Sequence, residues 1–91
     1  MDRKTFLRIT RALVDSRRFE ILERIASAQH EISCVALKAK IPISRATLSH
    51  HIKELATAGL IEIRRESKYM FLRIRRRTWR QYMNRLGKIA P

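Results

Sequence analysis

The side chains that could do chemistry gather in residues 44–57, which read S-R-A-T-L-S-H-H-I-K-E-L-A-T. Their hydroxyls and adjacent histidines suit nucleophilic catalysis, zinc binding or hydrogen bonding to nucleic acid. Leu48, Ile52 and Leu55 recur at helical spacing, so a helix is predicted with the hydroxyls on its convex opposite face. Catalysis needs a cleft with converging groups, and two glycines with no acidic cluster offer little to build one. We therefore expect this protein not to be an enzyme.

The adjacent histidines do not predict a zinc site. Side chains one residue apart diverge around a helix, so His50 and His51 cannot chelate one ion together. His50 is expected to point outward and to hydrogen-bond a base or a phosphate, whereas His51 lies beside the apolar stripe and should be packed, with its hydrogen bond satisfied. Cys34 is the only cysteine, and such a residue is more often a small buried hydrophobe than a sensor. We predict no metal and no cofactor.

The net charge predicts a polyanionic partner. The 91 residues include 21 Lys and Arg against 8 Asp and Glu, which gives +13 with neutral histidines. This excess favours nucleic acid first and an anionic membrane surface second, and a merely soluble basic surface is the plain alternative. No apolar run approaches the roughly 20 residues that span a bilayer, and the N-terminus carries charges every few positions. With one cysteine, the chain fits a reducing compartment, so we expect a cytoplasmic protein that does not bind membranes.

The surrounding elements predict a small, mostly α-helical fold with a β-hairpin. Apolar spacing indicates helices over residues 5–14, 17–28, 34–40, 44–58 and 78–89, with a short strand at 31–33. Phe19 is expected to face the core from the second helix. Pro42 forces a turn before the fourth helix and Gly59 ends that helix. Residues 60–64 and 69–74 then read as two strands joined at a charged turn.

This order is typical of a winged helix-turn-helix, here one domain over residues 1–91 with about five helices and a two- or three-stranded wing. The helix-turn-helix covers about residues 34–58 and the wing about 60–74. Small polar groups let the 44–58 helix approach base edges, and wing cations can follow the phosphate backbone or simply keep a sheet edge solvated. The residues expected to contact double-stranded DNA are Ser44, Arg45, Thr47, Ser49, His50, Lys53, Arg64, Arg65 and Lys68.

Three segments resemble the ArsR/SmtB family of bacterial winged-helix regulators. They are D-S-R-R-F-E-I-L-E-R-I from Asp15, S-R-A-T-L-S-H-H-I-K-E-L-A-T-A-G-L-I from Ser44 and R-R-E-S-K-Y-M-F-L-R-I from Arg64. The resemblance implies a homodimeric repressor that inserts two recognition helices into successive major grooves of a near-palindromic operator. In that family the first and last helices form the dimer interface, which implies Phe6, Leu7, Ile9, Leu13, Trp79, Tyr82, Met83 and Leu86 here. Any of these residues could instead belong to the chain's own core.

The chain departs from the family pattern at the metal-binding positions. Metal-sensing members carry a C-V-C pair where this chain has Ser33, Cys34 and Val35, and the last helix lacks paired Asp and His. Ser67 replaces the usual glycine at the wing turn, which is tolerable if the turn needs no positive φ. We expect a DNA-binding repressor without a metal site and with an unknown effector. The alternative is a non-specific architectural or RNA-binding protein that uses the same basic surface.

Overall fold

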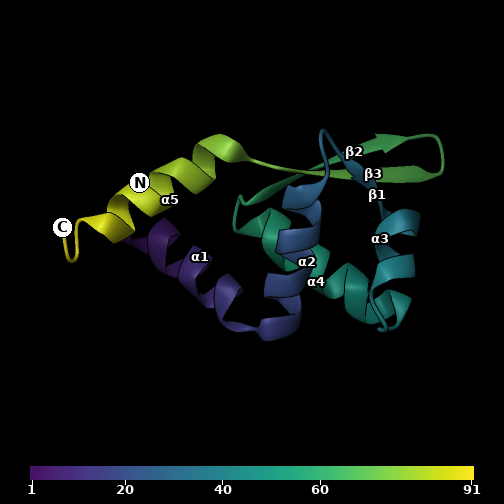
Figure 1. Cartoon of the computed structure of the whole chain (residues 1–91), viewed down its shortest axis with the longest axis horizontal. Coiled ribbons are helices and arrows are strands. Elements are labelled where there is room, and N and C mark those ends of the chain that lie inside the picture. Colours follow the sequence, from purple (N-terminus) through teal and green to yellow (C-terminus); the bar gives the residue numbers. More distant parts are fainter.

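A computed structural model describes residues 1–91 and contains five helices and a three-stranded sheet (Figure 1). In chain order the elements are α1 (Arg3–Val14), α2 (Ser16–Ser27), β1 (Ile32–Ser33), α3 (Cys34–Lys40), α4 (Arg45–Thr57), β2 (Ile61–Glu66), β3 (Tyr69–Ile74) and α5 (Arg76–Gly87). The predicted fold class is confirmed, and so is the short strand before the third helix. None of the helices has the length and apolar content needed to cross a bilayer.

Side-chain caps determine where four of the helices begin. Asp2, Asp15, Ser33 and Ser44 each accept a hydrogen bond from the backbone N–H three residues later. Each cap satisfies a donor that the first helical turn would otherwise leave without a partner. Asp15 also ends α1, so it alone separates α1 from α2.

The turn of the helix-turn-helix and the end of α4 follow from two residues with restricted or unusual backbones. Ile41, which precedes Pro42, is extended at φ −129° and ψ 126° and ends α3. Gly59 has φ 81°, the left-handed conformation that a helix C-terminus favours. Together they fix the start and the end of α4 as the sequence predicts.

The sheet has the strand order β1-β3-β2 with antiparallel pairing throughout. Ile63 pairs with Leu72 in the β2–β3 hairpin, and Leu72 pairs with Ile32 of β1. Ser67 begins the two-residue turn of this hairpin and has φ 55°. From the sequence, Ser67 is expected to be tolerable if the turn needs no positive φ. The turn does need a positive φ at this residue, where glycine is preferred.

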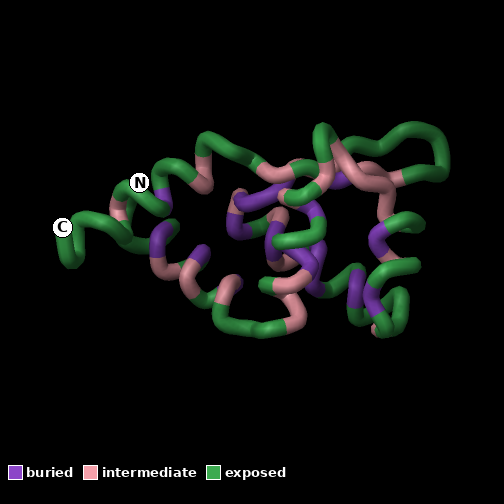
Figure 2. Tube along the Cα trace, viewed as in Figure 1, coloured by how far each residue is buried: buried purple, intermediate pink, exposed green.

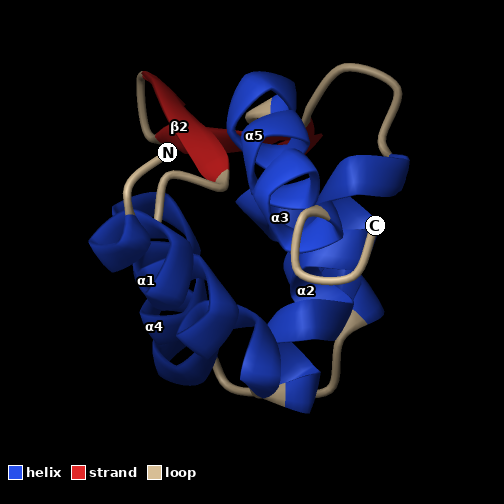
Figure 3. Ribbon diagram, turned by 90° about the vertical axis from the view of Figure 1, so that its left-hand side faces the viewer, coloured by secondary structure: helices blue, strands red, loops and turns tan.

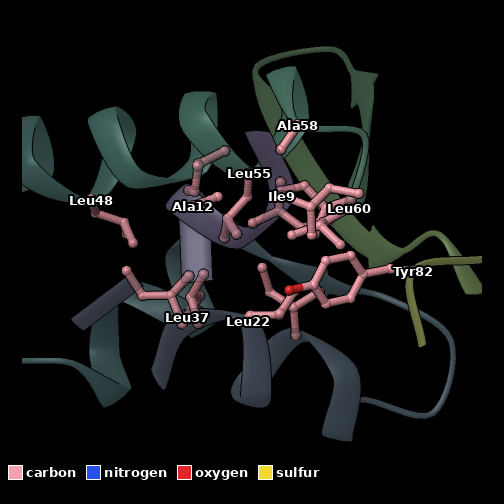
Figure 4. Packing of buried hydrophobic residues seen from close by; sticks show 14 of the residues in the cluster. Ile9, Ala12, Leu22, Leu37, Leu48, Leu55, Ala58, Leu60 and Tyr82 are labelled. Atoms are coloured by element: carbon pink, nitrogen blue, oxygen red, sulfur yellow. The ribbon is translucent and has the colours of Figure 1, made fainter. Parts of the chain in front are cut away.

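One hydrophobic core joins all five helices to the sheet. Its sixteen members include Ile9 of α1, Leu22 of α2, Leu37 of α3, Leu55 of α4 and Tyr82 of α5 (Figure 4). Buried positions concentrate at the centre of the molecule, and the ends are mostly exposed (Figure 2).

The expectation that Phe19 faces this core is wrong, because its side chain is 40% exposed. Phe19 precedes Ile21 by two residues, which rotates it by about 200° from the fully buried Ile21 side chain. It therefore lies on the outer side of α2.

The molecule measures 42 × 22 × 20 Å, and its long axis separates two ends with different content. Helices α1 and α5 lie at one end with both termini, and the β2–β3 hairpin extends at the other (Figure 1). Figure 3 looks along the molecule from the end that carries α1, α5 and both termini. Helix α4 contacts α1 at the first end and β2 of the hairpin at the other.

Candidate nucleic-acid interface

Helix α4 has one buried face and one exposed face. Leu48, His51, Ile52 and Leu55 are at most 7% exposed. The six residues predicted to contact DNA from this part of the chain are all exposed, namely Ser44, Arg45, Thr47, Ser49, His50 and Lys53. The structure therefore collects them on the solvent side of one helix whose other side is fixed in the core.

At the start of α4, a hydrogen bond between the Ser44 and Thr47 hydroxyl groups orients both side chains. Ser44 Oγ accepts the Thr47 N–H at 3.1 Å, and the Ser44 hydroxyl donates to Thr47 Oγ1 at 2.9 Å. In this arrangement the Thr47 hydroxyl proton is left to donate outward. A helix N-terminus with a free hydroxyl donor is suited to an anionic oxygen, such as a DNA phosphate.

His51 is a packed residue, as predicted. Its Nδ1 accepts a hydrogen bond from Arg18 Nε at 3.3 Å, and Arg18 Nη1 also donates to the Ala12 carbonyl at 3.4 Å. Burial lowers the pKa of His51, an effect that the nearby Asp15 carboxylate partly opposes. Arg18 thus ties α4 to the junction of α1 and α2, a role that no local sequence signal indicates because Arg18 and His51 are far apart in the chain.

His50 and His51 point in different directions. Their ring centroids are 5.7 Å apart with an interplanar angle of 53°, and His50 is exposed. No three His, Cys, Asp or Glu side chains are grouped so that they could hold a metal ion. The surface of α4 therefore offers hydrogen-bond donors and acceptors, not a chelate.

Arg64 is the predicted DNA contact whose charge is already paired with two carboxylates of the chain. Its Nη2 lies 2.6 Å from Glu31 Oε1, its Nε donates to Glu31 Oε2 at 3.1 Å, and its Nη1 donates to Glu66 Oε2 at 3.1 Å. The guanidinium also stacks 4.5 Å from the Phe71 ring centroid. These carboxylates raise the pKa of Arg64, and its hydrogen bonds lower the pKa of Glu31. Arg64 therefore fastens the wing to Glu31, the residue before β1, whereas the prediction grouped it with Arg65 and Lys68 as a DNA contact.

Arg65 and Lys68 are the exposed wing cations without a carboxylate partner. Lys68 Nζ lies 5.6 Å from the Tyr69 ring centroid, close to the turn. Burial raises the pKa of the Cys34 thiol, and the nearby positive charge of Arg65 partly opposes this rise. Cys34 is half-buried and mostly protonated at neutral pH, which makes it a weak nucleophile.

The residues predicted for a dimer interface divide into two groups. Phe6, Ile9 and Tyr82 are 8%, 0% and 5% exposed within a single chain. Phe6 and Tyr82 stack at 5.0 Å between centroids, and Tyr82 exchanges a hydrogen bond of 2.9 Å with Thr10. The prediction is therefore corrected for these three residues, which join α1 to α5 and have little or no surface left for a partner.

The other five predicted interface residues retain exposed surface. Met83 and Leu86 are 46% and 40% exposed on α5. Leu7, Leu13 and Trp79 are half-buried against the core. An apolar surface therefore remains on the α1 and α5 end of the molecule, away from the wing.

The chain is similar in sequence to known transcriptional regulators. A family model described as a helix-turn-helix domain matches residues 1–64. The uncharacterized HTH-type transcriptional regulator YceK of Bacillus subtilis is 32% identical over 75 residues, which cover 82% of this chain and 75% of that protein. A Halobacterium salinarum protein named as a candidate repressor of the arsenical resistance operon, ArsR2, is 31% identical over 67 residues, 74% of this chain and 56% of its own length.

Among solved structures, the chain is similar to the Mycobacterium bovis domain Mb0332. That structure is described as a homodimeric winged helix-turn-helix DNA-binding domain and a possible ArsR-family transcriptional regulator. The identity is 27%, the TM-score is 0.75, and the match covers 99% of this chain and 85% of that one.

Proposed function

Because this chain belongs to the ArsR family of winged helix-turn-helix transcriptional regulators, we propose that it represses transcription as a homodimer bound to a near-palindromic operator. The observation that carries this proposal is the exposed face of α4, where short hydroxyls, His50 and Lys53 stand opposite a buried stripe. Charged and long side chains usually cover such a solvated face. Here the small groups leave room for the edges of bases in a major groove.

The proposed contacts have different tasks. Ser44, Thr47 and Arg45 lie at the start of α4 and are suited to phosphates, while Ser49 and His50 lie further along, where base edges are reached. In the wing, Arg65 and Lys68 carry the charges that are free to neutralise phosphates. Arg64 positions the wing and adds little free charge of its own.

A second copy of the chain is proposed to cover the exposed apolar surface on α1 and α5. The residues proposed for this contact are Leu7, Leu13, Trp79, Met83 and Leu86. The homodimeric description of the Mb0332 domain supports this assignment. The stacked Phe6 and Tyr82 would hold the two helices together beneath the contact.

Selection of bound sequences from random duplexes tests the DNA proposal. We expect an enriched, two-fold symmetric site whose half-sites are separated by about one helical turn, 10–10.5 base pairs. The selected duplex should bind at least ~10³ times more tightly than a random one at the same salt concentration. A population that stays random after several rounds would contradict operator recognition.

Non-specific binding to DNA or RNA is the second candidate, and the net charge of +13 favours it. In that case the selected and random duplexes would bind with similar affinity, and single-stranded RNA would compete equally well. The same affinity measurements therefore decide between the two functions.

His50→Ala tests base readout by α4. On the selected operator we expect a loss of discrimination of about 1–3 kcal/mol at the contacted base pair. His30→Ala is the matched control, because His30 is an exposed histidine in the loop before β1. An equal loss in both variants would contradict the proposed role of His50.

Met83→Glu combined with Leu86→Glu tests the dimer. The wild-type chain of 10.8 kDa should elute with twice that mass in light scattering, and the double variant should elute as a folded monomer. Val35→Glu is the control, since Val35 is 66% exposed on α3, outside the proposed interface. A wild-type monomer at micromolar concentration would contradict the proposal.

A further inference from the structure

A basic groove lies where β3 passes into α5, and we call it the arginine groove. It has a volume of about 680 Å³, and its lining includes Glu62, Arg73, Arg75, Arg76, Arg77 and Gln81. The C-terminal end of α2 and the loop after it form the remaining wall. No residue of α4 or of the wing turn lines this groove, so it is separate from the surface proposed to bind DNA.

Positive charge in the arginine groove exceeds what the chain itself neutralises. Arg73 Nε donates to Glu62 Oε2 at 2.6 Å, and Arg75 Nη2 lies 3.6 Å from Glu62 Oε1. Arg76 and Arg77 have no carboxylate within salt-bridge distance. Arg73 and Arg75 therefore share one carboxylate, and Arg76 and Arg77 are unpaired and exposed.

The backbone at this point is fixed, which gives these arginines a defined base. The Arg75 N–H donates to the Leu60 carbonyl at 2.8 Å, and the Trp79 N–H donates to the Arg75 carbonyl at 3.1 Å. Helix α5 begins without a side-chain cap, so the N–H groups of its first turn add positive potential beside Arg76 and Arg77.

The arginine groove is also separate from the surface proposed for the dimer. Gln81 and Met83 are two residues apart on α5, which places them about 200° from each other around the helix. Gln81 lines the groove, and Met83 belongs to the exposed apolar surface. Arg77 lies four residues before Gln81, on the same side of α5, whereas Arg76 lies on the side of Met83 but about two turns nearer the start of the helix. A partner that covers Met83 and Leu86 would therefore leave Arg77 and Gln81 open.

We propose that the arginine groove binds a small, multiply charged anion of the phosphate or polyphosphate class. Guanidinium groups form paired hydrogen bonds with phosphate oxygens, and two unpaired ones favour a ligand with at least two negative charges. The volume lies in the range of small-molecule sites. The mostly polar lining, with only three hydrophobic residues, disfavours an apolar ligand.

Calorimetric titration with inorganic pyrophosphate tests this assignment at constant ionic strength and without DNA. The wild-type chain should bind with a dissociation constant below about 1 mM. Arg76→Gln with Arg77→Gln should weaken binding at least ~10-fold because two charge-assisted contacts are lost. Lys4→Gln with Lys40→Gln removes the same net charge from exposed positions outside the groove and should change the affinity less than about 2-fold.

Glu62→Gln should raise the affinity for pyrophosphate, whereas Arg76→Gln with Arg77→Gln should lower it. Removal of this carboxylate frees Arg73 and Arg75 for the ligand, so pyrophosphate should bind about 3-fold or more tightly. Glu23→Gln is the matched control, because Glu23 is an exposed carboxylate on α2 that does not line the groove. Equal effects of the two substitutions would indicate general attraction by the net charge and would overturn the proposal.

Two further results would also overturn the proposal, namely an absence of pyrophosphate binding and an equal loss in both double variants. If pyrophosphate does not bind and Arg76→Gln with Arg77→Gln also loses affinity for random duplex, the groove would be assigned to the DNA backbone instead. Since the titration contains no DNA, its outcome does not depend on whether an operator exists.

Discussion

The division of charge in the wing leads to a quantitative prediction about the salt dependence of DNA binding. Arg65 and Lys68 are free, while Arg64 is paired with Glu31 and Glu66. In a dimer the free residues offer four cations, and each neutralised phosphate contributes about 0.9 to the slope of log K against log salt. Arg65→Gln with Lys68→Gln should therefore flatten that slope by about 3.6.

The size of this effect makes it easy to measure. Between 100 and 300 mM salt, a slope difference of that size corresponds to about a 50-fold smaller loss of affinity for the variant than for the wild type. Fluorescence anisotropy with the selected operator, at five or more salt concentrations, gives both slopes directly. The variant should bind more weakly at low salt, and its affinity should then decline more slowly as salt is added.

The matched control removes a cation and a carboxylate together. Arg64→Gln with Glu31→Gln removes an ion pair and leaves the net charge of the chain unchanged, and we expect its slope to stay within about 0.5 of the wild-type value. The reasoning is refuted if this control flattens the slope as much as Arg65→Gln with Lys68→Gln. In that case Arg64 would contact phosphates despite its two carboxylate partners.

Three further predictions concern stability. Ser67→Gly should stabilise the chain by about 1 kcal/mol in urea unfolding because it relieves the positive φ at the wing turn, and an unchanged midpoint would contradict this. Tyr82→Phe should cost about 1 kcal/mol through loss of the hydrogen bond with Thr10, and Thr10→Val in the Tyr82→Phe background should then cost little more. Burial lowers the pKa of His51, so the stability it contributes is present above the ordinary pKa of about 6.5 and is lost as the pH falls below it. His51→Gln should flatten the pH dependence of unfolding between about pH 5 and 8, and an unaltered profile would assign that dependence to other groups.

Local sequence signals were sufficient for the elements of the fold. Ser44 and Gly59 mark the ends of α4 because capping and positive φ depend on residues close in the chain. The spacing of Leu48, Ile52 and Leu55 identifies the buried face of α4 and hence the opposite surface. The exposed position of His50 and the packed position of His51 follow from the same spacing.

Pairings between distant residues could not be derived in this way. Glu31 neutralises Arg64, and Arg18 holds His51, and each pair is separated by 33 positions. Tertiary packing alone brings these partners together, so the charges of the hairpin predicted Arg64 only as one of the wing cations available to phosphates. The same limit applies to Ile9, whose apolar character fits a dimer interface and a core equally well until its burial is known.

The junction at Asp15 has a consequence for the geometry of an operator. A single residue separates α1 from α2. Close to it, Arg18 of α2 donates hydrogen bonds to the Ala12 carbonyl of α1 and to His51 of α4, the helix proposed to read bases. If two copies associate through α1, the angle between α1 and α2 sets the distance between the two α4 helices of the dimer. Substitutions at Asp15 would then alter the preferred number of base pairs between half-sites while leaving the preferred base sequence of each half-site the same.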